Sequence, residues 1–263
     1  MSKYRIFDIH THIFPEKIAD KATGAIGEYY GIEMDGRGTP EALLESGKKI
    51  EVEKYLVLPT ATKVEQVQSA NDFIAEMQKE HSNFVAFGTL HPDLADPASE
   101  IDKIIGMGLH GIKFHPEFQN FSLDDKAMLP FYKALEGKLP VLIHMGDANR
   151  DSSHPKKLAE ILDAFPGLTV IGAHFGGFSA WEESCEYLVG KNVYFDTSSS
   201  LFKLDKEKAV EMIRNHGVEK MLFGTDFPMW LHVEEFERFM KLDLTEDERR
   251  MILYDNAAKL LKL

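Results

Sequence analysis

Short apolar runs alternate with longer amphipathic stretches along the whole chain. The runs are nearly continuous and rich in β-branched and aromatic residues, which is typical of parallel strands that are buried on both faces. They predict eight strands, at residues 4–10, 54–59, 84–90, 111–115, 140–144, 168–174, 193–198 and 221–226.

The stretches between these strands carry apolar side chains at three- and four-residue steps, as amphipathic helices do. One such stripe runs through residues 62–81 and another through residues 154–165. Pro155 stands near the start of the second stripe and Gly217 follows a later one, where each residue type is favoured. Alternation of strand and helix over about 250 residues predicts an α/β fold, a (β/α)8 TIM barrel that forms one domain over residues 1–263.

Two segments fall outside this alternation. The connection of residues 11–53 is long and rich in glycine, and we expect a long loop between the first strand and the first barrel helix, serving as a lid or specificity loop. A surface excursion without a catalytic role is the alternative. The tail, residues 244–263, predicts a closing helix that begins with a capping box of Thr245 and Glu248.

Composition and charge narrow the classes of function. The net charge of -13 over 263 residues disfavours nucleic acids and anionic membrane surfaces as partners, because both attract basic patches. The single cysteine, Cys185, excludes an internal disulfide framework and favours a reducing compartment. The N-terminal segment lacks the apolar core of a signal peptide, and no apolar run approaches the ~20 residues of a membrane span. A cytoplasmic protein is expected.

Histidines gather where the predicted strands end. In a TIM barrel the carboxyl ends of the strands converge on one mouth. The first strand ends at His10 with His12 two residues on, and the fourth ends with Lys113 and His115. Because residues two apart on a strand point to the same side, each pair is expected to face the mouth.

Later strand ends supply His144, His174 and Asp226. Imidazole nitrogens with a carboxylate are ligands for a divalent ion, first zinc, with manganese or iron as alternatives. The predicted ligands are His10, His12, His144 and Asp226. Such an ion would lower the pKa of a bound water toward ~7, and His174 could then move a proton or polarise a substrate oxygen. Each residue alone has a structural alternative, but their convergence at one mouth favours the metal site.

The motifs DIHTH, GIKFHP, LIH, AHFGG and LFGTDFPM, in this order, resemble the amidohydrolase superfamily. The resemblance covers nearly the whole chain and is to the branch that contains aminocarboxymuconate-semialdehyde decarboxylase and its hydrolase relatives. It implies the same four metal ligands, and that Asp226 can also take a proton from water. It implies a catalytic role for His174, whose counterpart holds a second metal in binuclear members.

The resemblance also bears on substrate contacts. Lys113 falls on the strand where some binuclear members carry a carboxylated lysine. A free ammonium that attracts a substrate carboxylate is the preferred interpretation of Lys113, and carboxylation is the alternative. His115 is expected to contact the substrate or to act as an additional ligand. Arg150, after the fifth strand, is expected to bind an anionic group, with a solvated loop arginine as the alternative.

These observations predict a metal-dependent hydrolase that cleaves a small ester, lactone or amide with activated water. The alternative is a metal-dependent, non-oxidative decarboxylase of a small aromatic or unsaturated carboxylic acid. A barrel that only binds or scaffolds is a third class, and the intact ligand set argues against it. The expected partners are an anionic small-molecule substrate and a second copy of the chain in a homodimer.

Overall fold

The computed structural model describes residues 3–263. Residues 1 and 2, at the start of the predicted domain and of the N-terminal segment, lie outside the described residues. The chain groups into two compact units. Unit 1 has residues 3–58, 81–85 and 197–263, and unit 2 has residues Pro59–Glu80 and Ala86–Asp196. The prediction of one domain stays a prediction.

Unit 1 contains the two ends of the chain. Its first elements are β1 (Phe7–Thr11), α1 (Glu16–Tyr30), α2 (Pro40–Lys48), β2 (Lys54–Val57) and β3 (Phe84–Ala86), whose last residue belongs to unit 2. Its later elements are α9 (Lys206–His216), a 3-10 turn (Val218–Lys220), β9 (Met221–Leu222), α10 (His232–Met240), α11 (Glu246–Arg250), a π-helical turn (Met251–Asp255) and α12 (Asn256–Leu261).

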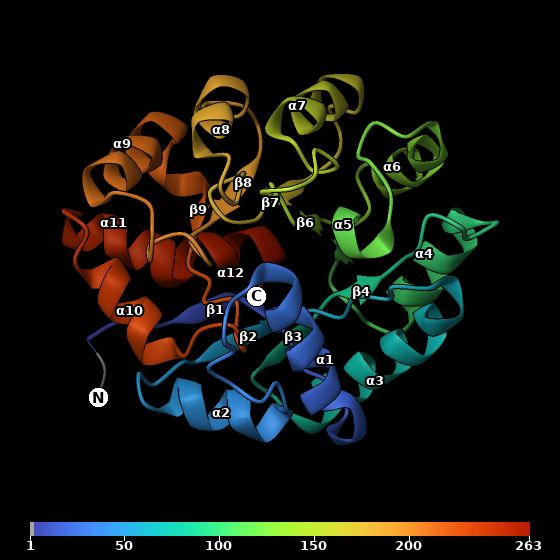
Figure 1. The fold of residues 1–263 in the computed structure, drawn as a ribbon, viewed down its shortest axis with the longest axis horizontal. Coiled ribbons are helices and arrows are strands. Elements are labelled where there is room, and N and C mark those ends of the chain that lie inside the picture. The colour runs from blue at the N-terminus through green and yellow to red at the C-terminus, as the bar shows by residue number, and fades with distance from the viewer. Residues whose placement is uncertain (1–2) are drawn as a thin grey trace. The chain divides into compact units, whose positions relative to one another are not determined.

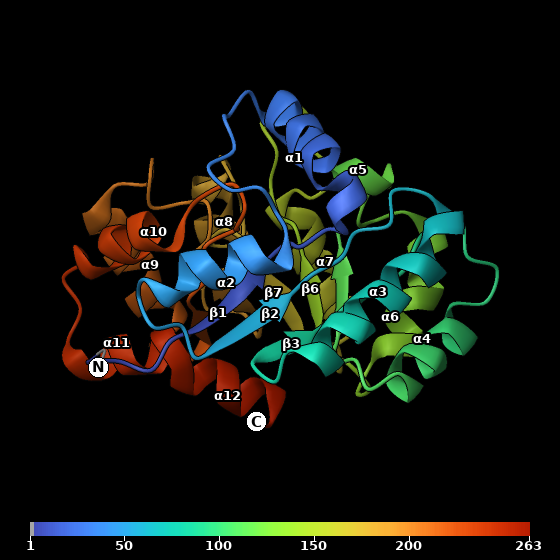
Figure 2. The same cartoon turned by 90° about the horizontal axis from the view of Figure 1, so that it is seen from below.

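The strands β1, β2 and β3 lie in that order in one sheet of unit 1, and Figure 2 shows β1 beside β2 with α12 below them. The parallel pairing of β1 with β2 has one irregularity. Asp8 lies opposite Tyr55, but Thr11, three residues on, lies opposite Val57, which is only two residues on. One extra residue is therefore accommodated in β1, between Asp8 and Thr11.

Unit 2 begins with a 3-10 turn (Val64–Gln66) and α3 (Val67–Glu80). Its strands are β4 (Gly88–Thr89), β5 (Ile112–Phe114), β6 (Val141–Ile143), β7 (Val170–Gly172) and β8 (Tyr194–Asp196). Its other helices are α4 (Pro97–Gly106), α5 (Pro116–Gln119), a 3-10 turn (Lys126–Met128), α6 (Leu129–Leu135), α7 (Pro155–Ala164) and α8 (Trp181–Tyr187).

The strands of unit 2 are parallel and lie in the order β4 to β8. In this register Ile112 faces Val141, which faces Val170. Every residue of β5, β6 and β7 is buried, as expected for parallel strands that are covered on both faces. Figure 1 shows α4, α6, α7 and α8 along one side of these strands.

All eight predicted strands are confirmed, and the third is interrupted at Phe87, between β3 and β4. The ring of Phe87 is fully buried. A Cβ on Gly111 would lie 2.4 Å from this ring, so glycine is required there for the close approach of the two segments. Among residues 3–263, no helix combines the length and the apolar character needed to cross a bilayer.

The connection between β1 and β2 is not the long loop that was predicted, because α1 and α2 form within it. Helix α1 buries only Ala19 and Thr23. The segment after α1 returns to the residues that follow Asp226. There the Gly36 N–H donates to the Pro228 carbonyl at 2.9 Å. The connection therefore contains two helices, and the segment between them is hydrogen-bonded to the residues that follow Asp226.

The predicted closing helix is confirmed in α11 and α12. The Thr245–Glu248 capping box opens α11 as expected. The π-helical turn between the two helices was not predicted. Its residues Ile252, Leu253 and Tyr254 are buried, and the Phe223 N–H donates to the Ile252 carbonyl at 3.0 Å.

Candidate metal centre

The main chain of unit 1 brings the N-terminal histidines beside Asp226. The Asp226 N–H donates to the His10 carbonyl at 2.8 Å, and the His12 N–H donates to the Phe227 carbonyl at 2.7 Å. Residues 10–12 and 226–227 therefore run alongside each other, although more than two hundred positions separate them in the sequence. The predicted association of these three side chains is found within one unit.

The two imidazoles present equivalent atoms to Asp226. The Nε2 atoms of His10 and His12 lie 3.5 and 3.6 Å from Asp226 Oδ1. The opposite nitrogens are engaged elsewhere: His12 Nδ1 is 2.9 Å from the Leu58 carbonyl, and His10 Nδ1 is 3.0 Å from Ser198 Oγ. Because a carbonyl can only accept, His12 Nδ1 donates, and the lone pair of His12 is on Nε2.

These distances fit a shared divalent ion. Two tetrahedral ligands that are each ~2.1 Å from one zinc ion lie roughly 3.4 Å apart. His10, His12 and Asp226 offer three ligand atoms that lie within 4.8 Å of one another. Hydrogen bonds to the far nitrogen are the usual way in which proteins fix the tautomer and orientation of a ligand histidine. The donor set therefore suits such an ion.

Asp226 is held in a strained conformation by its neighbours. Its φ angle is +64°, in the left-handed region that side-chain-bearing residues seldom occupy. Ser199 O–H donates to Asp226 Oδ2 at 2.6 Å, and the indole N–H of Trp230 donates to Ser199 Oγ at 3.0 Å. These contacts leave Oδ1 as the oxygen that faces the two imidazoles.

Ser198 and Ser199 were missed in the sequence. In the stretch "FDTSSS", Ser198 is the last residue of the predicted strand at 193–198 and Ser199 follows it, and both are fully buried. A run of three serines at a strand end was the available signal, because buried hydroxyls need hydrogen-bond partners.

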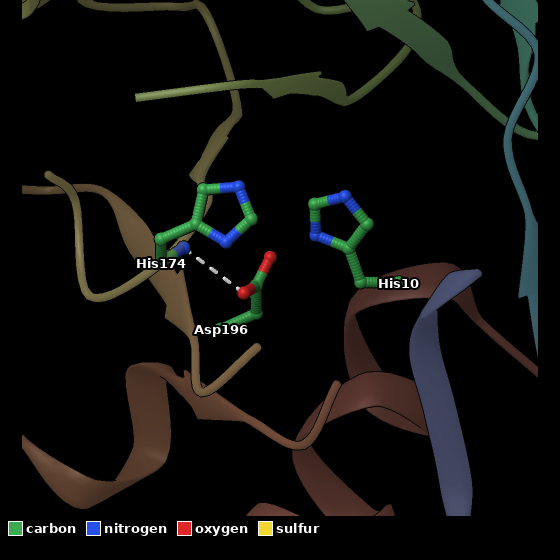
Figure 3. Close-up of side chains that lie close together, drawn as sticks. All are labelled: His10, His174 and Asp196. Atoms are coloured by element: carbon green, nitrogen blue, oxygen red, sulfur yellow. Dashed lines mark hydrogen bonds between the residues drawn. The ribbon is translucent and has the colours of Figure 1, made fainter. Parts of the chain in front are cut away.

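Unit 2 places the other predicted histidines together. His174 Nε2 lies 3.0 Å from His144 Nδ1, and His144 Nε2 lies 3.0 Å from the Gly146 carbonyl. The His174 N–H donates to the buried Asp196 carboxylate at 3.0 Å (Figure 3). The indole N–H of Trp181 donates to the His174 carbonyl at 3.1 Å. His174 is thus fixed by its backbone, with its ring against His144.

His115 belongs to a stack of three rings in unit 2. Its ring is nearly parallel to that of Phe118, with centroids 3.9 Å apart, and to that of His144, with centroids 4.0 Å apart. His115, Glu117 and His144 also bring ligand atoms within 4.8 Å of one another. The in-plane lone pairs of two stacked, parallel imidazoles cannot converge on one ion. This triplet is therefore not a metal site as arranged.

Known proteins resemble this chain in sequence and in structure. The family model described as Amidohydrolase matches residues 7–263. The chain belongs to the amidohydrolase family. No curated protein matches the sequence of this amidohydrolase.

Solved structures match this amidohydrolase over nearly its full length. An uncharacterised TIM-barrel protein from Bordetella bronchiseptica has a TM-score of 0.82 at 19% identity, covering 98% of each chain. A dihydroxybenzoic acid decarboxylase from Polaromonas sp., with bound manganese and an inhibitor, has a TM-score of 0.77 at 18% identity, covering 99% of this chain and 97% of its own. A probable 2-pyrone-4,6-dicarboxylic acid hydrolase from Acinetobacter baumannii has a TM-score of 0.72 at 14% identity, covering 98% of this chain and 100% of its own.

These matches establish the α/β TIM-barrel fold, as predicted. The protein is an enzyme of the amidohydrolase superfamily. Its structural relatives include several decarboxylases and a probable hydrolase. Two of the related solved structures, both decarboxylases, contain bound manganese.

The predicted anion contacts of the amidohydrolase both lie in unit 2 and differ in exposure. The Lys113 side chain is fully buried on β5. Arg150 lies in the exposed loop after β6, where its guanidinium donates to the Glu117 carbonyl at 3.4 Å. Their predicted roles, and that of His115, stay predictions.

Glu117 is a buried carboxyl group that was not singled out in the sequence. Ser153 O–H donates to its Oε1 at 2.6 Å, and its Oε2 lies 3.5 Å from His115 Nδ1. Burial raises the pKa of Glu117 from its usual value of 4.5 to about 7, and the Ser153 hydrogen bond offsets only part of that rise. The folded protein therefore keeps the Glu117 proton over a range in which the unfolded chain loses it.

Glu117→Gln is expected to change how stability depends on pH. Between pH 4.5 and about 7 the folded state binds more protons at Glu117, so the wild-type free energy of unfolding falls as pH rises. At ~1.4 kcal/mol per pKa unit the total fall is on the order of 3 kcal/mol. Glu117→Gln removes this titration. Urea denaturation should therefore show that the variant is more stable than the wild type at pH 8, with a smaller difference at pH 5.

The matched control is Glu160→Gln, which changes an exposed glutamate on α7. It is expected to shift the free energy of unfolding equally at both pH values. A Glu117→Gln variant whose stability runs parallel to that of the wild type from pH 5 to pH 8 would contradict the raised pKa.

Proposed function

We propose that this amidohydrolase is a metal-dependent hydrolase of a small ester, lactone or amide. One observation carries the proposal: the Nε2 atoms of His10 and His12 both face Asp226 Oδ1, at 3.5 and 3.6 Å, while their Nδ1 atoms have other partners. The site thus pairs two imidazoles, whose Nε2 atoms face the same point, with a carboxylate that is placed to accept a proton.

We propose His144 as the fourth ligand of the same ion. Support comes from the barrel fold, in which the carboxyl ends of the strands converge on one mouth. His144 directly follows β6, as His10 and His12 lie at the end of β1. Zinc is the first choice for three imidazoles and a carboxylate, and manganese, present in two of the structural relatives, is the second.

The reaction is divided among the chain's own side chains. When bound, the divalent ion polarises a substrate carbonyl and lowers the pKa of water in the pocket. Asp226 takes the proton of the attacking water, because its Oδ2 is fixed by Ser199 and Oδ1 faces the pocket. His174 delivers a proton to the leaving group. Lys113, as an ammonium that is not carboxylated, and Arg150 attract an anionic substrate, and His115 lines the binding site.

Non-oxidative decarboxylation of a small aromatic or unsaturated acid is the second candidate. Several structural relatives are named as decarboxylases, among them the Polaromonas enzyme and 5-carboxyvanillate decarboxylase from Sphingomonas paucimobilis. At 18% and 16% identity these matches support the fold rather than the reaction. Hydrolysis remains the proposal because Asp226 is oriented to accept a proton from water.

Product analysis tests the choice. The protein, reconstituted with zinc or with manganese, is incubated with a panel of lactones, esters, amides and aromatic acids. A hydrolytic product, accompanied by proton release when the substrate is an ester or a lactone, and no carbon dioxide, is the expected result. Carbon dioxide without any hydrolytic product would overturn the proposal in favour of decarboxylation. Protein treated with a chelator is the control and should show neither product.

A further inference from the structure

The carboxylate of Asp8 joins two segments of unit 1. Asp8 Oδ1 accepts the His10 N–H at 3.0 Å and the Thr225 N–H at 3.1 Å. Asp8 Oδ2 accepts the Thr225 hydroxyl at 2.5 Å and lies 3.2 Å from His232 Nε2. Asp8, Thr225 and His232 are fully buried, and His10 is 1% exposed. One carboxylate thus holds the residue before Asp226 and one of the two histidines that face Asp226.

The irregularity in β1 explains why a carboxylate is needed here. One extra residue is accommodated between Asp8 and Thr11, so the regular ladder with β2 is interrupted at His10. A buried N–H group that leaves a ladder needs another acceptor. Asp8 Oδ1 accepts the His10 N–H, so the side chain two residues earlier stabilises the irregular conformation that aims the His10 ring.

The ring of His232 lies on the other side of the carboxylate, with Nε2 3.2 Å from Asp8 Oδ2 but without hydrogen-bond geometry. Its Nδ1 lies 2.8 Å from Ser46 Oγ on α2, and its ring packs edge-on against Tyr55. Ser46, His232 and Asp8 have the composition of a nucleophilic triad. However, Ser46 is only 4% exposed and the other two are fully buried, so the serine is not available to a substrate. The arrangement is a support for Asp8, not a second catalytic site.

We propose that Asp8 is a positioning residue for the metal site: its hydrogen bonds join the His10 backbone to the Thr225–Asp226 segment and so set the separation of two proposed ligands. The expected effect on metal affinity rests on the proposed metal-dependent function. The hydrogen bonds of Asp8 to His10 and Thr225 do not depend on it and can be measured in metal-free protein.

The first measurement is amide hydrogen exchange in metal-free protein. In the wild type the His10 and Thr225 amides are expected to exchange slowly. Asp8→Ala removes their acceptor, so their protection should fall by more than about 10-fold relative to other strand amides. Asp8→Asn keeps a carbonyl oxygen for both N–H groups, and its amide can donate to the Thr225 hydroxyl. Protection in Asp8→Asn should stay within about 3-fold of the wild type.

The second measurement is metal affinity, with zinc and with cobalt as a spectroscopic probe. Loss of a group that orients metal ligands typically weakens binding by about 10- to 100-fold, which is the change expected for Asp8→Ala. The cobalt absorption bands should shift, because they report ligand geometry. Asp8→Asn is expected to bind within about 3-fold of the wild type with unchanged bands.

Ser46→Ala removes a partner of His232 but none of the hydrogen bonds to the Asp8 carboxylate, so it separates general stability from positioning. It is expected to lower the melting temperature with little change in metal affinity. If Asp8→Ala does not fold, Thr225→Val replaces it. This variant loses the hydroxyl bond to Asp8 Oδ2 and the bond that the hydroxyl accepts from the Phe227 N–H, and it should weaken metal binding by about 3- to 10-fold.

The outcomes are distinct. Wild-type metal affinity and an unchanged cobalt spectrum in Asp8→Ala, or in Thr225→Val if it is used instead, would overturn the inference. Binding in Asp8→Asn as weak as in Asp8→Ala would overturn it as well, because charge rather than hydrogen bonding would then be responsible. A wild-type protein that binds no metal would reject the proposed function, while the exchange rates would still decide whether Asp8 makes these hydrogen bonds.

Discussion

A variant in which His10 and His12 are both replaced by alanine is expected to fold and to lose its divalent ion. Removing both imidazoles leaves Asp226 as the only ligand in unit 1, and Ser198 loses the ring that it contacts at 3.0 Å. Weakening of metal binding by more than about 100-fold is expected, because even loss of an orienting group costs about 10- to 100-fold. Metal analysis of the purified protein, with and without reconstitution, measures the change.

Circular dichroism is recorded on the same samples, because loss of the ion identifies His10 and His12 as ligands only if the variant is folded. His81→Ala, which changes the histidine that directly follows α3, is the control and should keep the ion. About one ion per chain is expected in the wild type and in the control. A double variant that retains a full equivalent of metal with wild-type affinity would reject His10 and His12 as ligands.

Asp226→Asn is expected to lower the turnover number by about 100- to 10,000-fold, the usual effect of removing a general base. The amide remains close in size to the carboxylate and keeps one oxygen, but it cannot take a proton from water. Metal affinity should therefore fall less than in the double histidine variant. Steady-state kinetics with the substrate identified in the product assay, together with metal analysis of the same preparation, gives both values.

Ser199→Ala is the matched comparison for Asp226→Asn. It keeps the carboxylate but removes the hydroxyl that donates to Oδ2 at 2.6 Å, so it is expected to lower turnover by only about 10-fold. Turnover in Asp226→Asn within about 3-fold of the wild type, with metal bound, would exclude Asp226 as the base.

The strand ends were predictable because their signal is local. His10, His144 and His174 each directly follow an apolar residue of such a run, Asp226 comes three residues after Phe223, and all eight runs are found as strands. The association of His10 with Asp226 also followed from the fold, because parallel strands place their carboxyl ends together.

Other parts of the site were not predictable, for physical reasons. Helix α1 contains Gly24 and Gly27 and buries only two residues, so neither helix propensity nor an apolar stripe marked it within residues 11–53. The roles of Ser198 and Ser199 depend on side chains of distant segments. The raised pKa of Glu117 is a consequence of burial. None of these features produces a periodic pattern of residues in the sequence, so none could be predicted from it.

The hydrogen bond between Gly36, in the segment after α1, and Pro228 has a consequence for the engineering of this protein. The segment that follows α1 is hydrogen-bonded to the backbone immediately after the proposed general base. Insertions or substitutions at positions 32–38 are therefore expected to shift the backbone next to Asp226, the proposed general base. We expect laboratory evolution at these positions to alter substrate selectivity while all the proposed metal ligands are kept.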